Sequence, residues 1–202
     1  MAIFNGTTLG DTINGTSGDD VISGFGGDDS LRGNAGNDTL YGDAGFDILQ
    51  GGDGNDILMD SADGAAFQGD AGDDQLIGSA SLADQASYFF FFKTSGVTFV
   101  STFVPGAVTS TQADGLGGID TLTNIDTLSI TGSQFDDNLV GDASNNFING
   151  FSGNDTLSGK AGNDFLLGFD GDDALTGGSG NDTIDGIPLH TTPPMRSNRR
   201  FS

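Results

Sequence analysis

The sequence predicts an all-β protein: a parallel β-solenoid of glycine-rich repeats, with an irregular β insert between two repeat arrays. Three observations support this prediction. A period of nine residues runs without a gap over 6–77 and again over 132–185. Position six of the repeat is aspartate in nearly every copy, and position eight is always aliphatic or phenylalanine. Glycine recurs at positions one and four, where it would cost a helix about 1 kcal/mol per residue.

Each repeat is expected to form a six-residue turn followed by a three-residue strand. Side chains alternate along a strand, so only position eight faces inward. Two repeats form one coil, and stacked coils would form two parallel sheets around an aliphatic core. Glycine at position four permits a positive φ in a tight turn. The expected core residues are Ile13, Ile22, Leu31, Leu40, Leu49, Leu58, Phe67, Leu76, Leu139, Ile148, Leu157, Leu166, Leu175 and Ile184.

The chain is expected to divide into four segments. Residues 1–77 form the first array and 132–186 the second, with a β-rich insert at 78–131 and a flexible, basic, proline-rich tail at 187–202. Within the insert, the phenylalanine-rich stretch 87–108 is predicted to form paired strands that close the end of one roll, because GVTFV and STFV partly alternate polar and apolar residues and Gly106 follows Pro105 at a turn. The alternative is that this phenylalanine-rich segment is a sticky surface for an adhesion partner or for lipid.

The composition excludes several classes of partner. The formal net charge is -23, and all 29 acidic residues are aspartate. Such a charge repels nucleic acid and anionic membranes and attracts cations. No apolar run is long enough to span a membrane, and the start of the chain, MAIFNGT, shows no Sec signal peptide. The absence of cysteine excludes disulfides and zinc-thiolate sites.

The aspartates at position six point to a metal. A single turn aspartate usually caps its own backbone. Here, however, every second repeat returns to the same edge, so Asp20, Asp38 and Asp56 should stack about 4.8 Å apart. A ladder of bare carboxylates is destabilising, so cations should lie between its rungs. Carboxylate and carbonyl oxygens favour calcium over transition metals, and stacked carbonyls suit magnesium less well.

The segments GGDGNDILM (51–59) and GGSGNDTID (177–185) match every fixed position of the pattern GGxGxDxUx, where U is aliphatic. This pattern resembles the RTX (hemolysin-type) calcium-binding repeat of secreted bacterial proteins. The resemblance implies a parallel β-roll with calcium held between turns two repeats apart. It also implies export by a type I secretion system and folding on contact with extracellular calcium.

The family's calcium sites can be placed on this sequence by repeat position. The number of stacked aspartate pairs, including the weaker ones, then implies roughly six to ten calcium ions. The implied carboxylate pairs are Asp11 with Asp29, Asp29 with Asp47, Asp20 with Asp38, Asp38 with Asp56, Asp56 with Asp74, Asp137 with Asp155, Asp155 with Asp173, and Asp164 with Asp182. Turn carbonyls are expected near Gly18, Gly27, Gly36, Gly45, Gly54, Gly72, Gly153, Gly162, Gly171 and Gly180.

Several repeats depart from the pattern. Ala65 removes a position-six carboxylate, so the edge that carries Asp47 is expected to end there. Asn146 keeps an oxygen but no charge, so its site with Asp164 is expected to be weaker. The repeats without glycine at position four are expected to be caps or defects; they carry Leu9, Asp63, Phe135 and Ser144.

No catalytic constellation is found in the sequence, and the protein is predicted not to be an enzyme. His190, the single histidine, lies in the proline-rich tail, and the absence of glutamate excludes an HExxH motif. The predicted function is calcium binding by a secreted bacterial module that folds on binding extracellular calcium. One alternative is the C-terminal calcium-binding and secretion module of a larger secreted enzyme (a protease, lipase or alginate epimerase) whose catalytic domain is absent. Another is an adhesin-like or ice- or polymer-binding surface protein.

Overall fold

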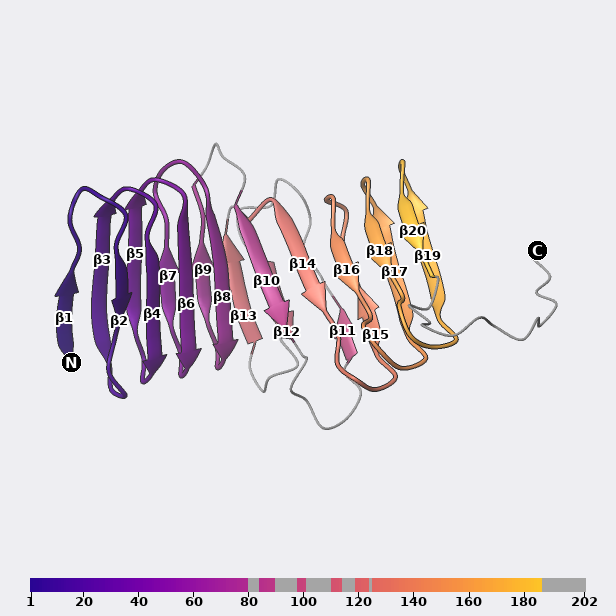
Figure 1. Ribbon diagram of the computed structural model, residues 1–202, viewed down its shortest axis with the longest axis horizontal. Coiled ribbons are helices and arrows are strands. Elements are labelled where there is room, and N and C mark those ends of the chain that lie inside the picture. The colour runs from indigo at the N-terminus through magenta and orange to yellow at the C-terminus, as the bar shows by residue number, and fades with distance from the viewer. Residues whose placement is uncertain (80–83, 90–97, 101–109, 114–118, 124, 187–202) are drawn as a thin grey trace.

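The chain winds into an elongated stack of β coils (Figure 1). The computed structural model describes residues 1–79, 84–89, 98–100, 110–113, 119–123 and 125–186, and these contain no helix. The predicted all-β solenoid with parallel strands is confirmed. Every strand pair within the two arrays is parallel, and the antiparallel pairing of β12 with β13 belongs to the insert.

A nine-stranded sheet, the long sheet, runs through both arrays. In spatial order its strands are β2 (Thr12–Asn14), β4 (Ser30–Ala35), β6 (Asp47–Asp53), β8 (Ala65–Ala71), β10 (Gln85–Phe89), β14 (Thr127–Thr131), β16 (Phe147–Asn149), β18 (Phe165–Leu167) and β20 (Thr183–Asp185). The insert therefore supplies strands that join the two arrays along this side.

Two shorter sheets form the opposite side, where the sequence predicts one. The N-terminal sheet contains β1 (Ala2–Asn5), β3 (Asp20–Gly26), β5 (Thr39–Ala44), β7 (Ile57–Met59), β9 (Gln75–Ile77), β13 (Ile119–Thr123) and β12 (Ser110–Ala113). The C-terminal sheet contains β11 (Thr98–Val100), β15 (Asn138–Val140), β17 (Thr156–Ala161) and β19 (Ala174–Ser179). This side is interrupted because the antiparallel strand β12 occupies the free edge of β13, where the next parallel strand would pair.

The register of neighbouring strands places each coil directly on the one before it. Leu40 of β5 pairs with Ile22 of β3 on one side and with Leu58 of β7 on the other. The shift between paired residues is eighteen residues, two repeats, as the sequence predicts. Position-eight side chains therefore stack on one another along the axis of the solenoid.

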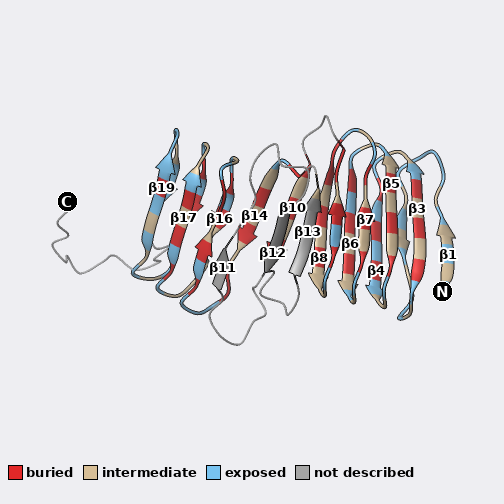
Figure 2. Ribbon diagram, turned by 180° about the vertical axis from the view of Figure 1, so that it is seen from behind, coloured by how far each residue is buried: buried red, intermediate tan, exposed pale blue. Residues whose placement is uncertain are grey.

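The core is a stripe of position-eight side chains. Figure 2 shows the buried residues as red bands across the strands. Most of the predicted core is fully buried, from Ile22 through Leu166. At the two ends of the stack, the predicted core residues are less buried than expected. Ile13 and Leu175 are only partly buried, and Ile184 is 49% exposed. The end coils have a neighbour on one side only, so their aliphatic side chains remain in contact with solvent.

Several strands are longer than the three residues predicted. β3, β6 and β8 each have seven residues, because pairing continues beyond position nine into the next repeat. Phe25 at position two, for example, pairs with Asp43 of the next coil. The start of each turn is thus part of the hydrogen-bonded sheet, which fixes the backbone that leads to position six.

The described strand from GVTFV, β11, pairs in parallel with β15 of the second array. STFV lies outside the described residues, so the strand pairing expected in this segment stays a prediction. Residues 101–109, 90–97 and the tail 187–202, including His190, lie outside the described residues. The prediction of a turn at Pro105 and Gly106 falls there too.

Candidate metal centre

The position-six aspartates form two hydrogen-bonded columns at the turn edges. In each column the backbone N–H of one aspartate donates to Oδ1 of the aspartate one coil further on, at 2.7–3.0 Å. Every pair implied by the sequence is joined in this way: Asp11–Asp29, Asp20–Asp38, Asp29–Asp47, Asp38–Asp56, Asp56–Asp74, Asp137–Asp155, Asp155–Asp173 and Asp164–Asp182. One carboxylate oxygen of each C-terminal partner is therefore occupied by the backbone.

The turns fall into two classes, which the repeat pattern alone does not separate. In the first class, here called open turns, the residues at positions two and four both have a positive φ. In the turn that begins at Gly33, for example, φ is 81° at Asn34 and 112° at Gly36. The other open turns begin at Gly24, Gly42, Gly51, Gly69, Gly150, Gly159, Gly168 and Gly177.

In seven of the nine open turns the second carboxylate oxygen of the position-six aspartate is buried without a hydrogen-bond partner. Oδ2 has none in Asp29, Asp38, Asp47, Asp56, Asp155, Asp164 and Asp173. A Cβ built on the position-one glycine of these turns would clash with this oxygen, as Gly33 with Asp38 illustrates. Glycine at position one thus leaves the space that the carboxylate occupies.

In the second class, here called capped turns, the turn itself satisfies the same oxygen. The backbone N–H of Thr16 donates to Oδ2 of Asp20 at 2.6 Å, and its hydroxyl donates at 2.8 Å. Thr7 does the same for Asp11, and Ser133 donates its N–H to Oδ2 of Asp137. In these turns the threonine or serine at position two therefore donates the hydrogen bond that the carboxylate oxygen of an open turn lacks.

The gaps between stacked open turns are lined by backbone carbonyls. A Cβ added to Gly54 would clash with the carbonyl oxygen of Gly36, one coil earlier, and one on Gly52 would clash with that of Asn34. From the other direction, the carbonyl oxygen of Gly51 lies 2.7 Å from a Cβ built on Gly33. Carbonyls from both turns thus point into the gap that the carboxylates border.

The carboxylates of several open turns have raised pKa values. Burial raises the pKa of Asp29, Asp38, Asp47 and Asp164, and neighbouring carboxylates add to the effect. In Asp56 and Asp155 the same causes raise the pKa to about 7. By contrast, the hydrogen bond from the Thr16 backbone lowers the pKa of Asp20. The open turns hold carboxylates whose charge is uncompensated, a state that a bound cation relieves.

These shifts predict that the metal-free chain is more stable in acid. For Asp56 and Asp155 the pKa rises from 3.8 unfolded to about 7 folded, so the folded chain binds more protons between these values. The stabilisation is fully present below about pH 4 and is lost as the pH rises through 7. Far-UV circular dichroism in metal-free buffers should therefore show more β structure at pH 5 than at pH 8. A β signal that increases with pH in the same buffers contradicts the assignment.

One sequence prediction about the columns holds only in part. Ala65 breaks the run of carboxylates after Asp47, as expected, but the column resumes beyond it, because the Ala65 N–H donates to Oδ1 of Asp84 at 2.8 Å. The N–H of Asp84 in turn donates to Asp126 at 3.1 Å, so the insert extends the column. Asp84 was not predicted because one extra residue in its repeat removes it from the nine-residue phase.

A second, outer ladder at position five was also missed. The N–H of Asn55 donates to the side-chain oxygen of Asn37 at 2.8 Å, and the N–H of Asn181 donates to that of Asn163 at 2.8 Å. These bonds run in the opposite direction to those of position six. The signal was present in the sequence, because position five is aspartate or asparagine in most repeats.

The family model of the RTX calcium-binding nonapeptide repeat (four copies) matches residues 5–40, 32–59, 67–81, 131–166 and 167–186, more than half of the chain. The chain belongs to the RTX calcium-binding repeat family. No curated protein matches the sequence. The geometry agrees with this family's ion, since the seven open turns named above each offer an unpartnered, buried carboxylate oxygen beside carbonyl oxygens, all of them hard ligands.

The RTX roll does not gather three acidic side chains at one point. Among the described residues, no group of three or more histidine, cysteine, aspartate or glutamate side chains is placed to hold a metal. A cation in this roll would therefore take two carboxylates and complete its shell with backbone carbonyls. The described part of the chain also has no helix that could span a membrane.

Proposed function

We propose that this RTX chain is a secreted module that folds when its open turns take up extracellular calcium. The orphaned Oδ2 atoms of the open turns carry the proposal, because a buried carboxylate oxygen without a donor is costly and calcium supplies the missing charge. Binding free energy would then contribute directly to folding free energy. Export by a type I secretion system belongs to this proposal and rests on the family.

The strongest sites would lie where two open turns are stacked on each other. There both turns offer carbonyls that face the gap, and neither carboxylate is capped by a position-two residue. The pairs that meet this condition are Asp29–Asp47, Asp38–Asp56, Asp56–Asp74, Asp155–Asp173 and Asp164–Asp182.

Weaker sites would lie where an open turn is stacked on a capped one. These are Asp11–Asp29, Asp20–Asp38 and Asp137–Asp155, in each of which the first carboxylate already accepts bonds from its own turn. The site of Asn146 with Asp164 would be weak for a similar reason. The Asn146 side-chain amide donates to Asp142 and to Asp164, each at 3.2 Å, and so occupies oxygens that an ion would use.

Within each site the chain's own groups have separate tasks. The hydrogen bond from the preceding coil fixes Oδ1 and so aims Oδ2 into the gap, as between Asp38 and Asp56. The left-handed residues at positions two and four turn their carbonyls toward the next coil. Calcium accepts six to eight such oxygens in flexible geometry, whereas magnesium requires a stricter octahedron.

Substitution of Asp56 tests the assignment. Asp56→Asn keeps the shape and removes the charge from an open turn that borders two proposed sites, so at least one ion should be lost. The calcium concentration at half-folding should rise at least about tenfold. The matched control is Asp53→Asn, an exposed aspartate of the same turn, which should leave both values unchanged. Native mass spectrometry gives the ion count and circular dichroism the midpoint. Equal effects of the two variants would refute the assignment.

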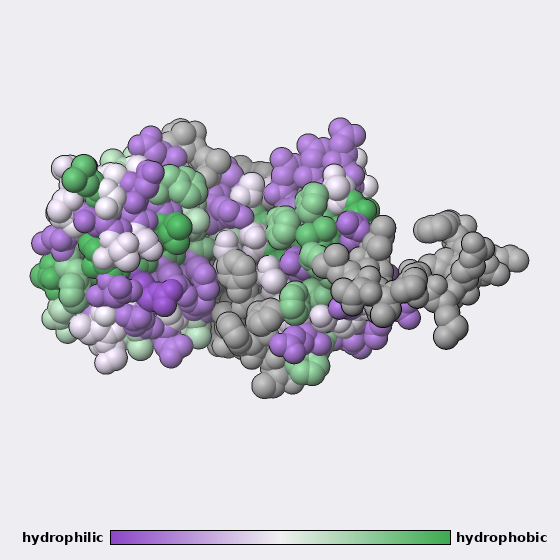
Figure 3. Space-filling model, viewed as in Figure 1, coloured by the Kyte–Doolittle hydropathy of each residue, from purple (hydrophilic) through white to green (hydrophobic). Residues whose placement is uncertain are grey.

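The alternative of a surface-binding protein draws support from one observation. On the long sheet, Phe147 and Phe165 stack with ring centroids 5.7 Å apart and are partly exposed, and Ile48 is 53% exposed. Exposed apolar side chains of this kind would suit an adhesive surface. They do not suit an ice-binding face, because they interrupt the outward row of threonines that such a face would need. Figure 3 shows hydrophobic and hydrophilic residues interspersed on the face that it presents. The alternative of a module from a larger secreted enzyme shares the calcium chemistry and would be tested by a longer reading frame upstream of Met1.

A further inference from the structure

In the turn at 60–66 the usual residues at positions one and six of the repeat are both replaced. Position one is Asp60 where the other repeats of this array have glycine, and position six is Ala65 where they have aspartate. The matches to the RTX repeat model also leave out residues 60–66. A carboxylate has been lost from one position of the turn and gained at another.

The Asp60 side chain is buried and makes no hydrogen bond. Asp60 is only 4% exposed, and neither Oδ1 nor Oδ2 has a hydrogen-bond partner. Burial, and then the carboxylates of Asp47 and Asp84, raise the pKa of Asp60 to about 7. The backbone N–H groups of Ser61 and Ala62 oppose this rise, but neither makes a hydrogen bond to the carboxylate. The charged groups nearest to it are the carboxylates of Asp47 and Asp84. A buried charge with only like charges around it calls for a cation.

The carboxylate of Asp60 is directed at the column that Ala65 would otherwise interrupt. A Cβ built on Gly42 would lie 2.5 Å from Oδ2 of Asp47 and 2.9 Å from Oδ1 of Asp60. Two unpartnered oxygens from successive coils therefore converge beside Gly42, in the gap between the turns at 42 and 60.

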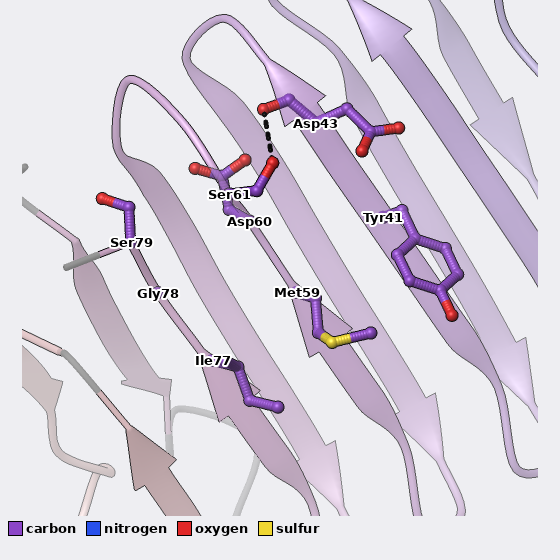
Figure 4. Close-up of a pocket in the computed structure, with 8 residues that line it drawn as sticks. All are labelled: Tyr41, Asp43, Met59, Asp60, Ser61, Ile77, Gly78 and Ser79. Atoms are coloured by element: carbon purple, nitrogen blue, oxygen red, sulfur yellow. Dashed lines mark hydrogen bonds between the residues drawn. The ribbon is translucent and has the colours of Figure 1, made fainter. Parts of the chain in front are cut away.

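Access to this point is open from one side. A cavity of about 440 Å³ is lined by Tyr41, Asp43, Met59, Asp60, Ser61, Ile77, Gly78 and Ser79. Figure 4 shows the Asp60 carboxylate at the turn end of this cavity, beside Ser61. The Ser61 hydroxyl donates to the Asp43 carbonyl at 3.5 Å and leaves the Asp60 oxygens free.

We propose that Asp60 and Asp47 hold an additional divalent cation, calcium, at the junction of the first array and the insert. Asp60, from position one, replaces the carboxylate that Ala65 lacks, and turn carbonyls complete the shell. The site differs from the others because its second carboxylate comes from outside position six. Asp84, whose Oδ2 is occupied by the Ser79 N–H at 2.7 Å, adds negative charge without being a ligand. The inference rests on calcium binding by the other turns.

The test compares two variants of Asp60 with a control in the intact chain. Asp60→Asn removes the charge, and Asp60→Gly restores the glycine of the other repeats. Asp63→Asn removes the same charge from an exposed residue of the same turn. At saturating calcium, native mass spectrometry should find one ion fewer in both Asp60 variants and the wild-type count in Asp63→Asn.

Thermal stability gives a second readout with opposite signs for the two interpretations. If Asp60 binds calcium, Asp60→Asn lowers the Tm of the calcium-loaded chain. If Asp60 is only a buried, unpaired carboxylate, the neutral side chain raises the Tm. A wild-type ion count in either Asp60 variant, or a raised Tm in Asp60→Asn, overturns the proposal. A wild-type chain that binds no calcium at all would instead refute the function proposed for the open turns.

Discussion

Removal of calcium will abolish most of the β-sheet signal of this protein at neutral pH. The sequence carries a net charge of -23, and the buried columns concentrate that charge along two edges. Each site at a hundredfold excess of calcium over its Kd stabilises the fold by about 2.7 kcal/mol. A few such sites equal the whole stability of an ordinary domain, about 5–15 kcal/mol. The folded state should therefore depend on the ions.

A calcium titration of the metal-free chain, followed by far-UV circular dichroism, measures this dependence. The expected result is a cooperative gain of β signal with calcium and little gain with magnesium at the same concentration. Sodium chloride at matched ionic strength separates specific binding from charge screening. Native β content with a cooperative melt in EGTA, or an equal response to magnesium, would show that the aspartates are ordinary turn residues.

Replacement of Gly54 by alanine will strongly destabilise the roll. Its φ of 131° lies where residues with a side chain are strained, and the new Cβ would clash with the carbonyl oxygen of Gly36. That oxygen belongs to the backbone and lines a proposed calcium site, so it cannot move without opening the stack. We expect a loss of at least about 2 kcal/mol in urea unfolding at saturating calcium, with a higher calcium midpoint.

Gly18→Ala is the matched control for this substitution. Gly18 also occupies position four, but its turn is capped, its φ is not left-handed, and no atom lies within 4 Å of a new Cβ. Its free energy of unfolding should change by less than about 0.5 kcal/mol. A similar loss in both variants would contradict the division into open and capped turns.

The nine-residue period carried most of the fold prediction. Every residue at position eight recurs at the same phase, so the period alone assigns Leu40, Leu49 and Leu58 to the core, where all three are buried. The nine-residue period also predicted the aspartate pairs correctly, because residues that pair between neighbouring coils are eighteen positions, or two repeats, apart. Prediction failed where the phase is lost. β10, β11 and Asp84 lie in the insert, and their pairing depends on contacts between residues distant in sequence.

The sequence by itself determined the parallel roll, its core and its two aspartate columns, since these follow from a local repeat that each coil copies onto the next. Only the tertiary structure decided which carboxylates lack a partner. That property depends on where the position-two backbone points, as the capped Asp20 and the orphaned Asp38 show. It also depends on which turn is stacked on which, and this stacking brings the carboxylate of Asp60 beside that of Asp47. Burial and hydrogen bonding between coils cannot be read from a repeat that looks alike in both cases.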